Sequence, residues 1–219
     1  MKVFMGGTYD PVHIGHLRMA LELSELLQAD VHLLPCFEPV HRGEPGATSV
    51  QRLEMLDLAT ENEPTLVVDQ REILRKGPSY TVDSLRSIRE QYGPDESVVL
   101  VLGTDAFNGL PDWHQWLEIT KLAHIIVLTR PGWELSASGE LGDLIKSCCF
   151  DRASGFDNDS DKNFDRLFDQ ASGYIVPLAL SALDVSSSKI RKTVLCGHSA
   201  RYLVPDPVWR YICDKKLYC

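Results

Sequence analysis

Short apolar runs alternate along the chain with segments in which apolar residues recur every three or four positions. The runs Val3–Met5, Val31–Leu34 and Leu66–Val68 predict strands, and the segments between them predict helices. The run Val98–Leu102 is apolar throughout, which is typical of a parallel strand covered on both faces, so we expect it at the centre of a sheet. This alternation predicts right-handed βαβ units and a doubly wound α/β fold, with one parallel sheet and helices on both faces.

The alternation continues with a helix predicted at Trp113–Leu122 and a strand at Ile125–Leu128, and then stops. Asp151–Asn163 is rich in Asp, Asn, Ser and Gly, a composition that cannot offset its ordering entropy by burial. We therefore expect residues 134–172 to form a variable or mobile insertion. The insertion is expected to lie within a single domain that spans residues 1–219.

The remaining part of the chain predicts a short strand and a helical end. Tyr174–Val176 is the strand, and one helix is expected to begin near Ser187. A last helix is expected at Asp206, with Asp206 as the N-cap and Pro207 at the first helical position.

Composition narrows the classes of protein that the chain can represent. The 219 residues carry 22 Lys and Arg against 31 Asp and Glu, a net charge of −9, and 44% are hydrophobic. This is the composition of a globular protein, and the acidic balance disfavours nucleic-acid and membrane-surface partners. The six cysteines form no C-x-x-C pair and are interpreted as reduced thiols, and the apolar run before Gly6 is too short for a signal or a membrane span. A cytoplasmic location is expected.

The segment between the first strand and the first helix contains the most informative residues. Ligands of α/β sheets bind in such crevices, and this segment begins with Gly6-Gly7 and ends with His13-Ile14-Gly15-His16. It matches neither common glycine-rich phosphate loop. Two histidines at a helix N-terminus are unfavourable as cations unless an anion joins them, which predicts a phosphate site. The alternatives are surface histidines without a ligand, or a zinc site, for which no further ligand stands at a suitable spacing; no metal site is predicted.

Two motifs at opposite ends of the chain resemble a known superfamily. Gly6–His16 resembles the (T/H)-x-G-H signature of the adenylyl- and cytidylyltransferases, and Val185–Arg191 resembles their (I/V)-S-S-(S/T)-x-I-R motif. A serine-rich run before a helix is also a common N-cap pattern, so the second motif alone is a weak signal. The resemblance rests on the presence of both motifs in this order. The resemblance implies a Rossmann-like fold. In it, serine hydroxyls, a helix N-terminus and Arg191 would form a second phosphate cradle facing the first.

The middle of the chain is similar to the bacterial nicotinate-nucleotide adenylyltransferases. The similar segments are Pro78–Leu85, Gly103–Phe107 and Leu110–His114, within a resemblance that covers residues 1–132 and 174–219. In that family the residues matching Thr81 and Trp113 hold the nicotinate ring. The alternatives are that Thr81 caps the following helix and that Trp113 is a core aromatic residue.

The sequence departs from this family's pattern in two places. The usual Trp-Tyr pair is Trp113-His114, and the usual P-P-H-(K/R) is Pro39-Val40-His41-Arg42. The second change keeps a cation, Arg42, that could meet a substrate phosphate.

The resemblance implies transfer of AMP from ATP to nicotinate mononucleotide, which gives deamido-NAD and pyrophosphate in NAD biosynthesis. Mg²⁺ would be carried by the ATP phosphates. The implied catalytic residues are His13, His16 and Arg191. The implied ATP-binding residues are Gly6, Gly7, Thr8, Gly15, Gly103, Asp105, Ser186 and Ser187. The implied nicotinate mononucleotide-binding residues are Arg42, Thr81, Trp113 and His114.

Two other functions stay open at this point. A sibling enzyme, such as pantetheine-phosphate adenylyltransferase or a cytidylyltransferase, would share the two phosphate motifs without needing Thr81 or Trp113. A nucleotide-binding module without turnover is the alternative from another class. Self-association into a homo-oligomer is also left open by the sequence.

Overall fold

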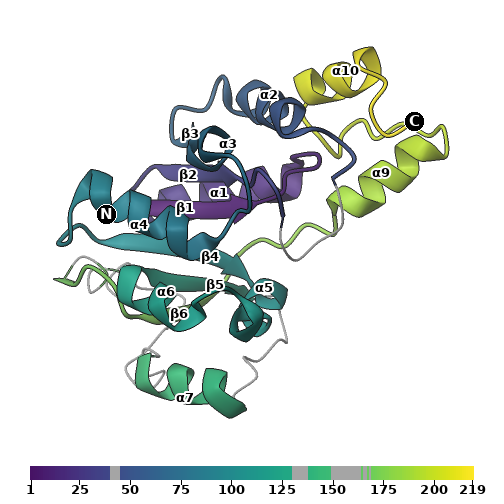
Figure 1. Cartoon of the computed structure of the whole chain (residues 1–219). Helices are drawn as coiled ribbons and strands as arrows, with labels where there is room; N and C mark the ends of the chain where they lie inside the picture. The colour runs from purple at the N-terminus through teal and green to yellow at the C-terminus, as the bar shows by residue number, and fades with distance from the viewer. Residues whose placement is uncertain (40–44, 130–137, 149–163, 165–166, 168) are drawn as a thin grey trace. The chain divides into compact units, whose positions relative to one another are not determined.

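The computed structural model describes residues 1–39, 45–129, 138–148, 164, 167 and 169–219. Figure 1 shows the order of the elements along the chain. The strands are β1 (Lys2–Gly7), β2 (Val31–Pro35), β3 (Leu66–Val68), β4 (Val98–Gly103), β5 (His124–Thr129) and β6 (Ile175–Ala179). The helices are α1 (Ile14–Leu27), α2 (Ser49–Thr60), α3 (Arg71–Arg75), α4 (Thr81–Tyr92), α5 (Thr104–Asn108), η1 (Leu110–Asp112), α6 (Trp116–Leu122), α7 (Gly139–Cys148), α9 (Ser187–Leu195) and α10 (Asp206–Asp214).

The strands form one six-stranded sheet in the order β3-β2-β1-β4-β5-β6. Strand β4 pairs in parallel with both β1 and β5, and β6 pairs in parallel with β5. All five apolar residues of β4 from Val98 to Leu102 are buried, as expected for a central strand. The doubly wound parallel α/β class predicted from the sequence is confirmed, and so is the central position of β4.

The chain divides into two compact units, which are described separately. The first unit comprises Met1–Met5, Leu26–Ala29 and Tyr80–Leu180. The second comprises Gly6–Glu25, Asp30–Ser79 and Ser181–Cys219. The prediction of a single domain over residues 1–219 stays a prediction.

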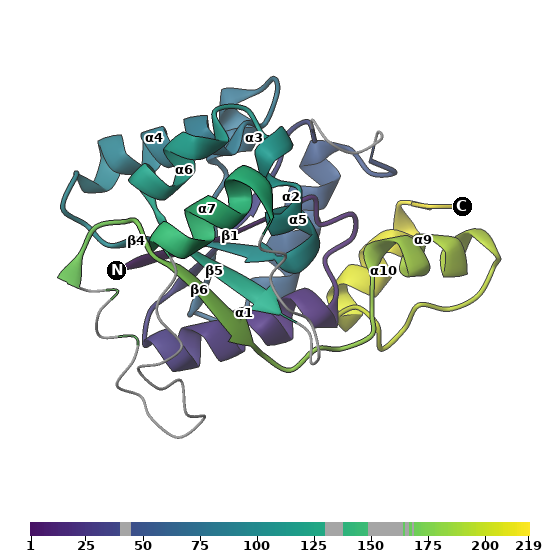
Figure 2. The ribbon, with the colours of Figure 1, turned by 90° about the horizontal axis from the view of Figure 1, so that it is seen from below.

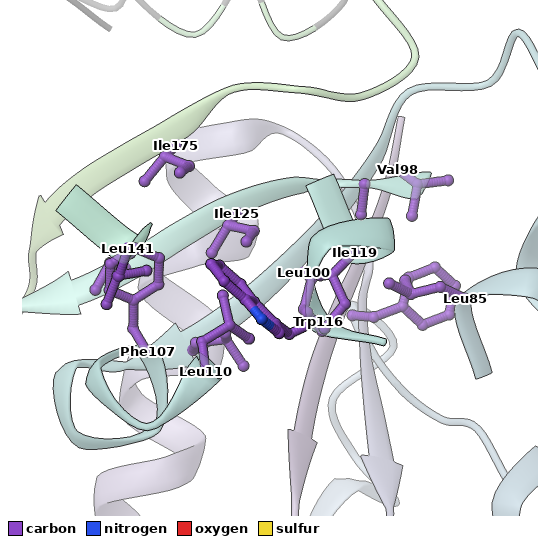
Figure 3. Close-up of a cluster of buried hydrophobic side chains, with 14 of the residues drawn as sticks. Leu85, Val98, Leu100, Phe107, Leu110, Trp116, Ile119, Ile125, Leu141 and Ile175 are labelled. Atoms are coloured by element: carbon purple, nitrogen blue, oxygen red, sulfur yellow. The ribbon is translucent and has the colours of Figure 1, made fainter. Parts of the chain in front are cut away.

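The first unit is organised around a cluster of buried apolar side chains. Figure 3 shows Phe107, Leu110 and Trp116 packed with Leu100 and Ile125 of the strands. Helix α4 packs against α6 in this unit (Figure 2). Because it includes Phe107 and Leu110, the cluster holds the segment that follows the carboxyl end of β4, where ligands of such sheets bind.

The second unit packs α2 against β3 and α10 against α2. Helix α2 begins with a capping box in which Thr48 accepts from the backbone of Gln51 and the Gln51 side chain accepts from the backbone of Thr48. This arrangement satisfies two otherwise unpaired backbone N–H groups.

Several element boundaries differ from the sequence predictions. The helix predicted from Trp113 begins at Trp116, because Trp113 is extended and Gln115 has a left-handed backbone conformation. Asp206 is the first residue of α10 rather than its N-cap, which is Pro205. The short helices α3 and α5 were not predicted, because five residues are too few to show a helical period.

Helix α7 lies inside the predicted insertion, residues 134–172, for which no helix was predicted. Its residues Leu141 and Ile145 are buried in the apolar cluster of the first unit. The proposal that residues 134–172 are a variable insertion is not tested by this finding.

Candidate nucleotide-binding site

Two stacked imidazoles open helix α1 in the second unit. His13 is the residue before the helix and His16 lies in its first turn; their ring centroids are 3.7 Å apart with 18° between the ring planes. The backbone N–H of His13 donates to Nδ1 of His16, and the backbone N–H of His16 donates to Nδ1 of His13, both over 3.4 Å. The two histidines therefore form a capping box of the kind that Thr48 and Gln51 form on α2.

The capping contacts decide the tautomer of each neutral ring. Because each Nδ1 accepts a backbone N–H, each neutral ring carries its proton on Nε2. Burial lowers the pKa of His13 from 6.5 to about 4, and a backbone hydrogen bond opposes this shift. His13 is therefore neutral at pH 7, and its Nε2–H is a hydrogen-bond donor for an oxygen anion.

Two glycines are required by the rings that pack on them. A Cβ on Gly7 would lie 2.9 Å from Cζ of Tyr9, whose ring is buried and contacts His16 edge-on at 5.1 Å. A Cβ on Gly15 would lie 3.1 Å from Cε1 and Nδ1 of His13. These glycines make room for the protein's own aromatic rings, whereas a Cβ on Gly6 would meet nothing within 4 Å.

Helix α9 is joined to the same loop by side-chain hydrogen bonds. Ser187 Oγ donates to the carbonyl of Pro11 at 2.9 Å, and Nη1 of Arg191 donates to the carbonyl of Asp10 at 2.7 Å. Ser186 is the N-cap of α9 and accepts from the backbone N–H of Lys189. The hydroxyl of Ser187 thus holds the loop, and its phosphate contact stays a prediction.

The structure brings the three predicted catalytic residues into one unit. His13 and His16 stand at the N-terminus of α1, and Arg191 on α9 is bonded to the loop that leads into α1. Two helix N-termini and a guanidinium thereby surround one short loop, an arrangement that stabilises phosphate.

A second arginine, which the sequence analysis did not single out, supports this loop from within. Arg52 of α2 is 1% exposed and donates to the carbonyls of Thr8 and Phe37, at 2.7 and 2.9 Å. Its positive charge therefore lies beneath the segment in which Thr8 was predicted to bind ATP. Arg52 could not be predicted from the sequence, because an arginine four residues after the N-cap of α2 is equally typical of a solvent-exposed helix position.

The residues expected to bind the nucleoside and the nicotinate lie in the first unit. Gly103 ends β4 and precedes α5, whose first turn contains the exposed Asp105. Thr81 is the first residue of α4; the N-cap is Tyr80, which makes no side-chain capping bond, so the alternative that Thr81 caps this helix is wrong.

Trp113 and His114 lie just before α6 in the first unit. Trp113 is half-buried and packs against the apolar cluster. His114 is exposed, and its ring lies 4.6 Å from the ring of Tyr80. The structure therefore places Trp113 partly in the core, and the nicotinate contacts of both residues stay predictions.

Arg42, predicted to meet a substrate phosphate, lies outside the described residues. Among the residues that the structure describes, no group of three His, Cys, Asp or Glu side chains is placed to hold a metal ion. Within the same residues, no helix combines the length and the apolar character needed to cross a membrane.

Comparisons with known proteins establish the family of the chain. Residues 4–193 match the cytidylyltransferase-like family. The chain is 44% identical over 218 residues to a probable nicotinate-nucleotide adenylyltransferase of Hahella chejuensis, covering 99% of this chain and 94% of the relative. A relative with the same description from Cellvibrio japonicus is 45% identical over 97% of this chain and 96% of its own. The chain belongs to the nicotinate-nucleotide adenylyltransferase family.

Solved structures support the fold of this family member. A nicotinic acid mononucleotide adenylyltransferase of Plasmodium falciparum, complexed with NaAD, aligns with a TM-score of 0.70 at 14% identity, over 100% of this chain and 98% of that chain. A putative nicotinate-nucleotide adenylyltransferase of Vibrio parahaemolyticus aligns with a TM-score of 0.60 at 15% identity, over 100% and 96%. The family predicted from the sequence motifs is confirmed.

Proposed function

We propose that the chain transfers AMP from ATP to nicotinate mononucleotide. An oxygen of the acceptor's 5′-phosphate attacks the α-phosphorus of ATP, the bond from that phosphorus to the bridging oxygen breaks, and pyrophosphate leaves with the bonding electrons. The product is the dinucleotide deamido-NAD. The observation that supports this proposal is the capping box formed by His13 and His16. It stands in a chain that is more than 40% identical to relatives described as probable nicotinate-nucleotide adenylyltransferases.

The reaction needs charge stabilisation and orientation rather than a covalent intermediate. Negative charge grows on the departing pyrophosphate, so fixed donors aimed at it lower the barrier. The Nε2–H groups of His13 and His16 are such donors, and the capping contacts fix their orientation before ATP binds. Arg191 supplies a full positive charge to the β- and γ-phosphates.

ATP is proposed to arrive as its magnesium complex, with the metal bound to phosphate oxygens. Asp10, the buried carboxylate of the loop, accepts from Gly46, Ala47 and Tyr218 and is paired with Arg191. Its oxygens are therefore engaged by donors within the protein. This fits a metal that is held by the substrate and its waters rather than by a cage of protein ligands.

Thr81, Trp113 and His114 are proposed to bind the nicotinate mononucleotide, and Gly103 with Asp105 the nucleoside of ATP. Arg42 is proposed to meet the acceptor's phosphate. An aromatic ring such as Trp113 stacks on a pyridine ring, and a threonine hydroxyl can donate to its carboxylate.

The test is pyrophosphate release with ATP and a panel of acceptors. Nicotinate mononucleotide should give release and a dinucleotide product, whereas nicotinamide mononucleotide and phosphopantetheine should give much less. Pyrophosphate release with ATP and phosphopantetheine but not with ATP and nicotinate mononucleotide, or release with CTP in place of ATP, would assign the chain to a sibling reaction. Tight ATP binding without release with any acceptor would indicate a module without turnover.

Arg191→Ala should lower kcat/KM for ATP by about 10²–10³-fold, the usual effect of removing one charged donor from a phosphoryl-type transition state. Lys192→Ala is the matched control, because Lys192 is the next residue of α9 and is exposed. His16→Ala should also lower kcat with little change in fold. Equal activity of the Arg191 and Lys192 variants would refute the role given to Arg191.

A further inference from the structure

Tyr218 packs against the loop between β1 and α1 through a contact with Asp10, although 208 positions separate the two residues in sequence. Its hydroxyl donates to Oδ1 of Asp10 at 2.8 Å. Its ring also covers Gly46, where a Cβ would lie 3.0 Å from two of the ring carbons and 3.3 Å from Cδ of Arg191. The segment after α10 is therefore packed against the same group of residues that holds Arg191.

Asp10 has several partners within the second unit. The side chain is 3% exposed. Its Oδ2 accepts from the backbone N–H of Gly46 at 2.7 Å and lies 3.4 Å from Nη1 of Arg191, and its Oδ1 accepts from Ala47 at 3.0 Å and from Tyr218. A carboxylate offers about four acceptor sites. Three of them accept hydrogen bonds, from Gly46, Ala47 and Tyr218, and the Asp10 carboxylate is also paired with the charge of Arg191 at 3.4 Å.

The contacts of Arg191 leave part of its guanidinium available. Nη1 donates to the backbone carbonyl of Asp10 at 2.7 Å, a shorter contact than the 3.4 Å to the carboxylate. Neither Nε nor Nη2 donates to any residue in the described part of the chain, and the side chain is 36% exposed. A guanidinium with a free edge binds a phosphate through two parallel hydrogen bonds.

We propose that Tyr218 is a positioning residue, which occupies one acceptor site of Asp10 and so keeps the free edge of Arg191 directed at the triphosphate. This inference rests on the proposed function. Without the hydroxyl, Oδ1 of Asp10 loses a donor in a buried place, and Arg191, whose Nη1 already lies 3.4 Å from Oδ2, is placed to compensate. The guanidinium then turns from the carbonyl into a closer pair with the carboxylate, and its N–H groups are withdrawn from the ligand.

The protonation state of Tyr218 fits this role. Burial, together with the Asp10 carboxylate, raises the pKa of the Tyr218 hydroxyl far above its usual value of 10. The hydroxyl therefore stays a donor throughout the pH range of an enzyme assay.

The decisive variant is Tyr218→Phe, which removes only the hydroxyl and keeps the ring over Gly46. The KM for ATP should rise about tenfold, the factor given by about 1.4 kcal/mol, close to the lower end of what one hydrogen bond to a charged group contributes. The KM for nicotinate mononucleotide should stay within twofold, and kcat should change less than the KM for ATP. A merely structural role would instead change both KM values together or lower the amount of folded protein.

Tyr211→Phe is the matched control. Tyr211, on α10 in the same unit, also donates its hydroxyl to a carboxylate, that of Glu54. This variant should leave the KM for ATP unchanged. A rise equal to that of Tyr218→Phe would overturn the proposal.

A double-mutant cycle tests whether Tyr218 acts through Arg191. In an Arg191→Ala background, Tyr218→Phe should change the KM for ATP less than twofold, because the group that it positions is gone. A second tenfold rise would show that the two residues act independently and would overturn the proposal.

The failure of this inference can be distinguished from the failure of the proposed function. If the wild-type chain releases no pyrophosphate with any acceptor, the proposed function fails, and the positioning role is then read from calorimetric binding of a non-hydrolysable ATP analogue. A tenfold higher Kd for Tyr218→Phe than for Tyr211→Phe would still support the role of Tyr218. Equal Kd values would overturn it.

Discussion

The buried imidazole of His13 predicts a pH dependence of folding stability that can be worked out in advance. Its pKa in the folded chain is about 4, against 6.5 for an exposed histidine, because burial disfavours the charged ring. The unfolded chain therefore binds more protons between these two values. The neutral imidazole therefore costs no stability above pH 6.5. As the pH falls toward 4 the free energy of unfolding decreases, and at pH 4 this loss reaches about 3 kcal/mol, at 1.36 kcal/mol per pKa unit. At pH 5 the loss should be about 2 kcal/mol.

The matched variant is His13→Asn, which can still accept the backbone N–H of His16 at the N-cap but does not titrate. Urea unfolding of both proteins at pH 8, 6 and 5 gives the difference in their free energies of unfolding. Subtracting one protein from the other cancels other groups, including His124, whose pKa burial also lowers. Between pH 8 and pH 5, the free energy of unfolding of the wild type should fall by about 2 kcal/mol more than that of His13→Asn. A difference that does not change with pH would refute the burial of a neutral imidazole at this helix end.

Two further pairs of variants test the packing that supports the site. Arg89→Ala should lower the free energy of unfolding, measured by thermal melts, by about 3 kcal/mol, because it leaves carbonyls of three separate segments without their donor. Arg86→Ala breaks only exposed contacts, with Asp83 and Gln115, and should cost less than about 1 kcal/mol. Gly7→Ala should destabilise by about 1–3 kcal/mol, because its Cβ would meet the buried ring of Tyr9, whereas Gly6→Ala has open space and should unfold at the wild-type denaturant concentration. Similar midpoints for the two glycine variants would contradict the packing described here.

The fold could be predicted from the sequence because its strongest signals are local. A five-residue apolar run such as Val98–Leu102 has few alternatives to a buried strand, and alternation with helices then restricts the topology. The boundary at Trp116 could not be predicted in this way. It depends on a left-handed backbone at Gln115, for which neither side-chain type nor spacing gives a signal. Helix α7 was missed although Leu141, Leu144, Ile145 and Cys148 recur at helical spacing, because the polar stretch Asp151–Asn163 that follows led to the prediction of an insertion over the whole segment.

The residues of the candidate site also differ in whether local sequence signals could predict them. His13 and His16 could be predicted because both stand within four residues of each other at a strand-to-helix junction, and spacing alone places them on one face. Asp10 lies in the same motif but its partners come from Gly46 and Tyr218, which no period connects to it. Contacts between segments so far apart are determined by tertiary packing, and a single sequence does not display them.

The different origins of these contacts have a physical consequence for the site. Local capping orients the imidazoles of His13 and His16, because each ring accepts from the backbone of the other at the start of one helix. Arg191 has no such local support. Its orientation depends on Asp10, and through Asp10 on the loop before α2 and on the segment after α10. The histidine donors should therefore keep their geometry when distant segments loosen, whereas the guanidinium should lose its own. A change far from the loop is then expected to weaken the hold on the triphosphate through Arg191 before it affects the histidines.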